Sequence, residues 1–122
     1  MKLTRRVSPV LALLFAAALC AQEPAAKKLY VVTYVDVFPN FAADTNKAML
    51  EFVAASKKDA GFVRFEVMRD VDRVNHFAMV EVWQNRQAYE AHLAQEHTKQ
   101  FRTRIQPYLG SPFDERLYYV QE

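Results

Sequence analysis

Hydrophobic and polar positions follow regular periods between residues 29 and 120. Four runs rich in β-branched and aromatic side chains are typical of strands. They cover residues 29–38, 62–71, 74–83 and 113–120. Residues 41–59 and 86–105 instead place apolar side chains three or four positions apart, as amphipathic helices do. The order strand, helix, strand, strand, helix, strand predicts an α+β domain, with an antiparallel sheet and both helices on one face.

Short polar segments are expected to separate these elements. Asn40 and Asn85 suit the N-cap positions of the two helices, and Gly61 suits the end of the first. Asp72 and Arg73 predict a tight hairpin between the second and third strands.

Both faces of the predicted sheet are apolar. In the third strand Phe77, Met79 and Trp83 point one way together with Glu81, and three aliphatic residues point the other way. Two helices cover only one face of a four-stranded sheet, and an exposed apolar face is unusual in a soluble monomer. We therefore expect a symmetric homodimer formed through the second sheet face.

Residues 1–21 have the pattern of a secretory signal peptide, with a basic start and an uncharged apolar run at residues 10–19. That run is shorter than the ~20 residues of a membrane-spanning helix, so a stable membrane anchor is disfavoured. Lipidation at Cys20 and export by a twin-arginine signal fit the sequence less well than ordinary secretion. We expect residues 22–28 to be a linker, residues 29–122 to be the domain, and the protein to be secreted or periplasmic.

Removal of the leader changes the charge balance. It takes away three basic side chains and no acidic one, which turns 16 basic residues against 14 acidic ones into 13 against 14. A near-neutral domain lacks the positive surface that nucleic-acid binding requires. The single cysteine leaves with the leader as well, which excludes disulfides and thiolate chemistry from the mature domain.

The segment FAMVEVWQNRQAYEAHLAQEHTKQF, residues 77–101, resembles the antibiotic biosynthesis monooxygenase (ABM) family. The similarity consists of an apolar strand that ends in Glu-x-Trp and a helix with Ala88, His92, His97 and Phe101 at the family's spacing, and it extends more weakly to DAGFVRFEVMRD at residues 59–70. It implies a ferredoxin-like βαββαβ protomer, a dimeric α/β barrel and a pocket between sheet and helices.

Family members include cofactor-independent monooxygenases that oxidise quinols or polycyclic phenols, haem-degrading enzymes and small isomerases. The haem-degrading pattern is incomplete here, because Thr33 and Arg102 stand where it has asparagine and histidine.

His97 and His92 are the candidate bases. A partly buried imidazole can remove a proton from a phenol, although a purely structural role also fits His97 on the apolar stripe of the helix. His92 is expected at the pocket mouth or in solvent. Five positions along one continuous helix separate the two imidazoles by about 140°, so we expect no shared metal ion. We also expect no cofactor, because no cofactor motif is present.

Glu81 is the third candidate catalytic residue. A carboxylate among apolar side chains needs a donor, and a histidine of the second helix or Arg64 could supply it. Trp83 is either packing or the wall of an aromatic pocket. Its expected companions in substrate binding are Tyr34, Phe77 and Met79.

These observations favour an exported, cofactor-independent monooxygenase that oxidises a small phenolic or quinol compound with O2. A non-catalytic dimer that binds a small aromatic or apolar ligand is the alternative, and a structural dimer without a ligand is a third possibility.

Overall fold

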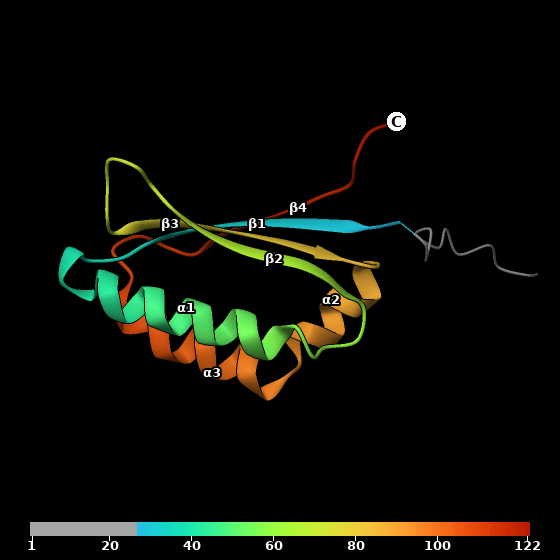
Figure 1. Ribbon diagram of the computed structural model, residues 1–122, viewed down its shortest axis with the longest axis horizontal. Coiled ribbons are helices and arrows are strands. Elements are labelled where there is room, and N and C mark those ends of the chain that lie inside the picture. The colour runs from blue at the N-terminus through green and yellow to red at the C-terminus, as the bar shows by residue number, and fades with distance from the viewer. Residues whose placement is uncertain (1–26) are drawn as a thin grey trace, which may run out of the picture.

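Four strands form one antiparallel sheet in the computed structural model, which describes residues 27–122 (Figure 1). The strands lie in the order β2-β3-β1-β4. Their bounds are β1 Leu29–Asp36, β2 Phe62–Arg69, β3 His76–Trp83 and β4 Asp114–Tyr118. The proposed signal peptide and most of the linker lie outside the described residues.

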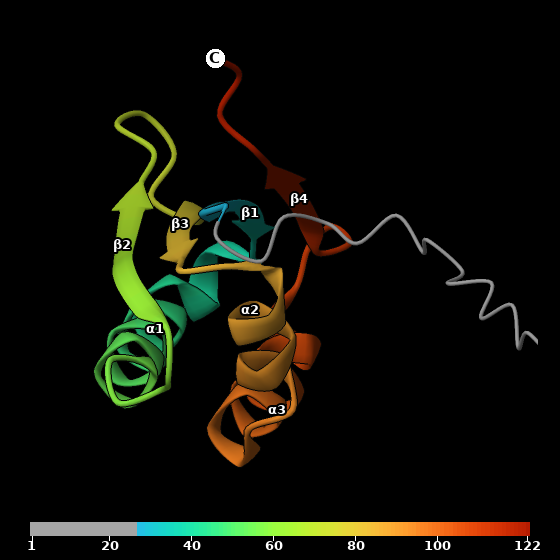
Figure 2. The same ribbon diagram turned by 90° about the vertical axis from the view of Figure 1, so that its right-hand side faces the viewer.

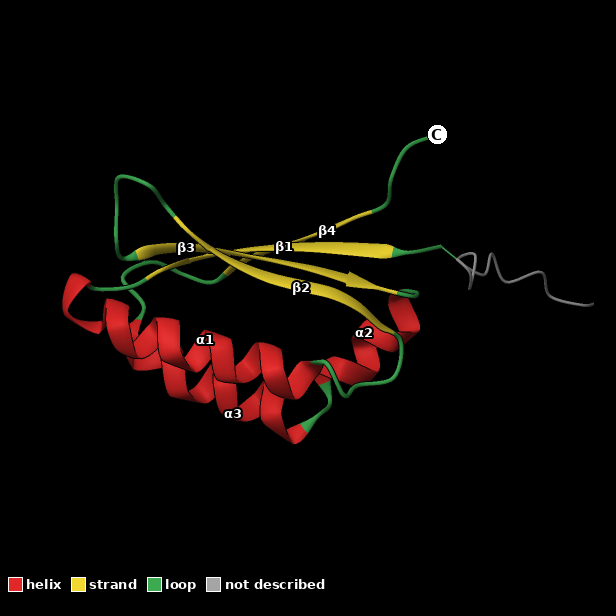
Figure 3. Ribbon diagram, in the orientation of Figure 1, coloured by secondary structure: helices red, strands yellow, loops and turns green. Residues whose placement is uncertain are grey.

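All helices lie on one face of this sheet, as Figures 2 and 3 show. They are η1 Pro39–Phe41, α1 Ala42–Ser56, α2 Arg86–Leu93, α3 Glu96–Ile105 and η2 Gln106–Tyr108. Strands and helices in this arrangement confirm the predicted α+β, ferredoxin-like fold. No helix in residues 27–122 combines the length and apolar character needed to cross a membrane.

The two-residue period of the strands decides which side chains form the core. On β1 the residues Leu29, Val31 and Val35 face the helices and are buried, and Phe77 and Met79 do the same on β3. The helices contribute apolar side chains at their own spacing. These are Ala48, Met49 and Phe52 from α1, Tyr89 from α2, and Phe101 and Ile105 from α3.

The hairpin between β2 and β3 is longer than predicted. A two-residue turn of the favoured type requires positive φ angles, and within the described residues only Gly61 has one. The connection therefore spans residues 70–75, where Asp70 Oδ1 accepts hydrogen bonds from the backbone amides of Asp72 and Arg73, both at 2.9 Å.

Of the two predicted N-cap residues, one is confirmed and the other is wrong. Asn85 caps α2 through a 2.8 Å hydrogen bond from the Ala88 amide to its side-chain oxygen. Asn40 does not cap α1, because Pro39 starts a short 3-10 helix at residues 39–41 that leads directly into α1 without a side-chain cap.

The second predicted helix is wrong in one important respect. Residues 86–105 form two helices, α2 and α3, separated at Ala94 and Gln95. Neither residue is a glycine or proline, so local sequence gives no sign of the break.

Candidate functional site

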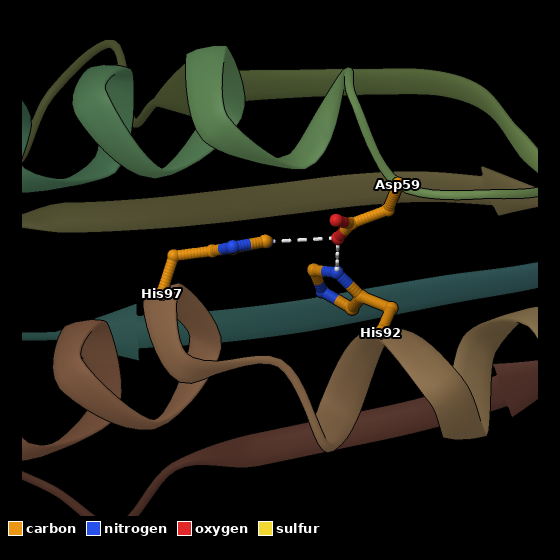
Figure 4. Close-up of side chains that lie close together, drawn as sticks. All are labelled: Asp59, His92 and His97. Atoms are coloured by element: carbon orange, nitrogen blue, oxygen red, sulfur yellow. Dashed lines mark hydrogen bonds and ion pairs between the residues drawn. The ribbon is translucent and has the colours of Figure 1, made fainter.

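Three side chains from three different elements meet at one carboxylate oxygen (Figure 4). Asp59, in the turn after α1, places its Oδ2 atom 2.7 Å from His92 Nδ1 and 2.8 Å from His97 Nε2. His92 comes from α2 and His97 from α3. Because a carboxylate oxygen accepts, each imidazole donates from the nitrogen that faces Asp59.

The break between α2 and α3 makes this meeting possible. On one continuous helix the two imidazoles would point in different directions. The hydroxyl of Thr98, in the first turn of α3, instead donates a 2.7 Å hydrogen bond to the carbonyl of His92. This bond ties the start of α3 to the end of α2 and turns His97 towards Asp59.

Gly61 brings the turn that carries Asp59 close to α2. It has a φ of +77°, and a Cβ atom built on it would lie 2.4 Å from the Cβ of Ala88. Its carbonyl also accepts a 2.8 Å hydrogen bond from the Gln84 amide. Only glycine fits this conformation and this close approach together.

Glu81 extends the cluster into the protein interior. Its Oε2 atom accepts a 2.8 Å hydrogen bond from the Trp83 indole and lies 3.6 Å from His92 Nε2. Burial raises the pKa of the Glu81 carboxyl to about 7, and the indole hydrogen bond and Arg102 only partly oppose this shift. Glu81 therefore holds its proton far more readily than an exposed glutamate.

Burial also changes the basicity of His92, which is 1% exposed. It lowers the pKa of the imidazole, although the hydrogen bond to Asp59 acts in the opposite direction. Near pH 7 neutral His92 is thus favoured, and the Glu81 carboxyl beside it is close to half protonated. One polar path crosses the sheet-helix layer through Trp83, Glu81, His92, Asp59 and His97. Hydrogen bonds join its members except Glu81 and His92, which lie 3.6 Å apart.

The path reaches a small surface cavity at His97. This helix cavity, of about 200 Å³, lies between α1 and α3. Phe52 and Phe101 line it and stack on each other with ring centroids 4.2 Å apart. The Arg104 guanidinium donates a 2.6 Å hydrogen bond to Glu51, and both residues also line the cavity.

A larger hollow, of about 600 Å³, lies on the sheet face opposite the helices. This sheet cavity is remote from Asp59, His92 and His97, none of which lines it. It contains a separate ion pair, in which His76 Nδ1 lies 2.9 Å from Asp36 Oδ1. We therefore assign the candidate site to the smaller helix cavity, where the connected polar side chains reach the surface.

The structure brings together only some of the residues that were predicted to bind an aromatic substrate. Trp83 is 0% exposed and packs against His92 with the ring centroids 4.4 Å apart and the ring planes tilted by 30°, and Phe77 and Met79 are buried on the same sheet face. Tyr34 is 46% exposed on the other face, opposite Ala78 of β3. The expectation that Tyr34 lies beside Trp83 is wrong, because strand alternation places the two rings on opposite sides of the sheet.

The two histidines exchange their expected environments. His92, expected near solvent, is buried, and the side chain of His97, expected on the buried stripe, is 27% exposed. The helix break is the reason, because it rotates α3 relative to α2. The geometric argument against a shared metal ion fails for the same reason, since Asp59, His92 and His97 offer ligand atoms that all lie within 4.8 Å of one another.

Sequence reasoning missed Asp59 as a partner of the histidines. The expected carboxylate was Glu81, which lies near His92 but just beyond hydrogen-bond distance, and which forms no ion pair with Arg64 among the described residues. The only sequence signal for Asp59 is its position two residues before Gly61, which places it in the turn that ends the first helix.

The comparisons with known proteins agree with this fold. The family model described as antibiotic biosynthesis monooxygenase matches residues 28–104. No curated protein sequence matches the chain. Solved structures resemble it at low sequence identity.

Three of those structures show the extent of the similarity. A Bacteroides thetaiotaomicron protein described as a possible oxidoreductase is 22% identical, with a TM-score of 0.73 over 79% of this chain and 100% of its own. A putative antibiotic biosynthesis monooxygenase from Nitrosomonas europaea is 17% identical, with a TM-score of 0.74 over 81% and 95%. One from Caulobacter crescentus is 18% identical, with a TM-score of 0.74 over 80% and 93%.

Proposed function

Because the chain belongs to the antibiotic biosynthesis monooxygenase family, we propose that it oxidises a small phenol or quinol with molecular oxygen. In this proposal His97 is the general base, and neither flavin nor metal takes part. Fold and family alone do not define a reaction, so the proposal depends on the side chains of the helix cavity.

The pairing of His97 with Asp59 is the observation that carries the proposal. The 2.8 Å contact fixes a proton on His97 Nε2 and leaves Nδ1 as the basic nitrogen of a ring that lines the cavity. The Asp59 carboxylate would stabilise the imidazolium that forms when this nitrogen accepts a proton. A base held by a carboxylate at a cavity lined by phenylalanines suits a phenol as proton donor.

The size of the cavity limits the substrate. Its 200 Å³ is below the roughly 300–1,000 Å³ of pockets that hold drug-sized ligands. Phe52 and Phe101 offer apolar contacts to an aromatic ring, and Arg104 offers a donor at the cavity wall. A single-ring phenol or hydroquinone fits these features better than a polycyclic one.

The reaction balances without an external reductant. His97 removes the phenolic proton, and the electron-rich phenolate passes one electron to O2. The resulting pair combines at a ring carbon to give a hydroperoxide, which then loses water. One oxygen atom enters the ring as a new carbonyl group, the other leaves as water, and the substrate supplies all four electrons.

Glu81, His92 and Trp83 support this base from the interior. His92 donates to the same Asp59 oxygen as His97, so it fixes the orientation of that carboxylate. Glu81 and Trp83 hold His92 from its other side. Phe77 and Met79 pack the layer behind them, so in this proposal they act as supporting residues rather than as the cavity wall.

We further propose that the protein is exported after cleavage near residue 21 and that it acts as a homodimer. The leader pattern supports the first proposal and the uncovered apolar sheet face supports the second. The mass of the mature protein, purified from its host, tests the cleavage directly.

Oxygen uptake with a panel of hydroquinones tests the reaction. The full-length chain is assayed with excess chelator, and uptake without protein is subtracted. We expect turnover, a loss of at least about 100-fold in His97→Ala, and a smaller loss in Asp59→Asn, because a general base typically contributes 10²–10⁴-fold. His76→Ala is the matched control, since His76 is also paired with an aspartate and its side chain is also 27% exposed.

Two results would contradict this function. The first is oxygen uptake at the protein-free background for every compound in the panel. The second is turnover that His97→Ala leaves unchanged. Saturable binding of a hydroquinone without oxygen uptake would instead favour the non-catalytic ligand-binding alternative.

A further inference from the structure

The donor atoms around Asp59 form a set that divalent transition metals prefer. Two imidazole nitrogens and one carboxylate oxygen, from three separate elements, lie within 4.8 Å of one another. Such a mixed set suits Zn²⁺ and neighbouring ions rather than Ca²⁺ or Mg²⁺, which favour oxygen ligands alone. We propose that Asp59, His92 and His97 form a binding site for one divalent transition-metal ion, which takes no part in the proposed oxidation although Asp59 and His97 serve both.

A small movement and the transfer of two protons separate the hydrogen-bonded cluster from a ligand set. The imidazole nitrogens that now donate to Asp59 must give up these protons before they can bind an ion. Donors bound at about 2.0–2.1 Å to a tetrahedral ion lie roughly 3.3 Å apart. The two present separations are 2.7 and 2.8 Å, so the carboxylate has to withdraw by roughly half an ångström. Asp59 lies in the turn between α1 and β2, where its side chain can move without disturbing a helix or strand.

The second side of His92 faces a carboxyl group of the kind that metal-bound histidines use, just beyond hydrogen-bond distance. Ligating histidines usually direct their other ring nitrogen to a carboxylate or carbonyl, which fixes the tautomer and the ring. His92 Nε2 faces Glu81 Oε2 at 3.6 Å, and the Trp83 indole holds that same oxygen at 2.8 Å. A buried carboxylate at this place is costly unless it serves such a neighbour.

The break between α2 and α3 is a second indication that the arrangement of these side chains serves a function. Ala94, Gln95 and Glu96 are good helix formers, and the start of α3 has no side-chain cap. Violations of local preference of this kind are expected where function requires them. The break brings two nitrogens that would diverge on one helix to a common point.

An ion can also reach this point from solvent. The side chain of His97 is 27% exposed, whereas those of His92 and Asp59 are 1% and 8% exposed. His97 borders the helix cavity, so the exposed side of the cluster leaves room for a water or a fourth ligand.

Cobalt binding to the full-length, chelator-treated chain tests the site without any substrate. Every protein tested carries Cys20→Ser, which removes the only thiol as a competing ligand. Co²⁺ gives visible absorption bands in a four- or five-coordinate site, and a bound paramagnetic ion quenches nearby fluorescence. Trp83 is the only tryptophan and packs against His92, so its emission reports on this site.

We expect saturation at one Co²⁺ per chain, with both signals changing together, and competition by Zn²⁺. His97→Ala and Asp59→Asn should each weaken binding by at least tenfold, and Glu81→Gln by about tenfold, as expected for a residue that orients a ligand. His76→Ala is the matched control and should bind Co²⁺ like the parent. Far-ultraviolet circular dichroism verifies that each variant is folded.

No saturable Co²⁺ signal in the parent would overturn the metal site, and so would equal binding by the parent and by folded His97→Ala and Asp59→Asn. Either result leaves the proposed oxidation intact, because oxygen uptake is measured with chelator. If both proposals hold, bound Zn²⁺ takes Asp59 away from His97 and should inhibit oxygen uptake, with inhibition reversed by chelator.

Discussion

At the scale of single residues, the raised pKa of Glu81 links the candidate site to stability. Its pKa is about 7 in the folded protein, against an ordinary value of 4.5, because the carboxyl group is buried. The folded state therefore binds this proton more tightly than the unfolded state does. Its contribution to stability is complete below about pH 4.5 and is lost as the pH rises through about 7.

Replacement of Glu81 by Gln should remove this pH dependence. The free energy of unfolding of the wild type, relative to Glu81→Gln, should fall by up to about 3 kcal/mol between pH 4.5 and pH 8. The lowered pKa of His92 works in the opposite sense, but both proteins retain His92, so the comparison largely removes its effect. Urea unfolding at the two pH values, with chelator present, measures the difference. If the unfolding free energy of the wild type, relative to that of Glu81→Gln, stays constant or rises with pH, the raised pKa of Glu81 is contradicted.

At the scale of elements, two connections position the site. The first is the joint between α2 and α3, where Thr98 Oγ1 donates to the His92 carbonyl. In Thr98→Val this carbonyl loses one of its donors at nearly constant side-chain volume, and it keeps the 3.1 Å hydrogen bond from the Gln95 amide. We expect a loss of about 0.5–1.5 kcal/mol in unfolding free energy, the contribution of one hydrogen bond, together with reduced oxygen uptake. Thr103→Val, on the exposed side of α3, should change neither quantity appreciably. Loss of stability with full uptake would show that the joint does not orient His97.

The second connection is the turn at Gly61. In Gly61→Ala the added methyl group must occupy a positive φ and meets Ala88, so we expect a loss of about 2–4 kcal/mol in unfolding free energy. Because Asp59 lies in the same turn, oxygen uptake should fall as well. Gly110→Ala is the control, since a Cβ there meets only atoms at 3.6 Å or more. Equal stability of the two variants in thermal unfolding would refute the close-approach argument.

Some of these elements can be predicted from the sequence and others cannot. The strands, α1 and the helix-covered face follow from alternation and helical spacing, which are local properties of the chain. The break at Ala94 and Gln95 does not, because contacts with Asp59 and Thr98 impose it on a segment that favours helix. The pairing of Asp59 with His92 and His97 joins residues 33 and 38 positions apart, so it appears only in three dimensions.

At the scale of the whole molecule, the helices leave one sheet face uncovered. This face carries Tyr34 and Met68, which are 46% and 47% exposed, around a sheet cavity of about 600 Å³. The candidate site lies in the helix layer on the other side. A partner on the open face would therefore leave His97 and the helix cavity accessible, so dimerisation and substrate entry do not compete.

Tyr34→Lys tests whether a second copy covers that face. In a dimer the lysine ammonium would lose its water next to another apolar surface, so the dissociation constant should rise at least tenfold. Leu50→Lys places the same charge on the outer surface of α1, where Leu50 is 55% exposed, and should leave the dimer intact. Sedimentation velocity over a range of concentrations measures both variants and the parent. A parent chain that sediments as a monomer at every concentration would remove the dimer, whereas dissociation in both variants would place the interface elsewhere.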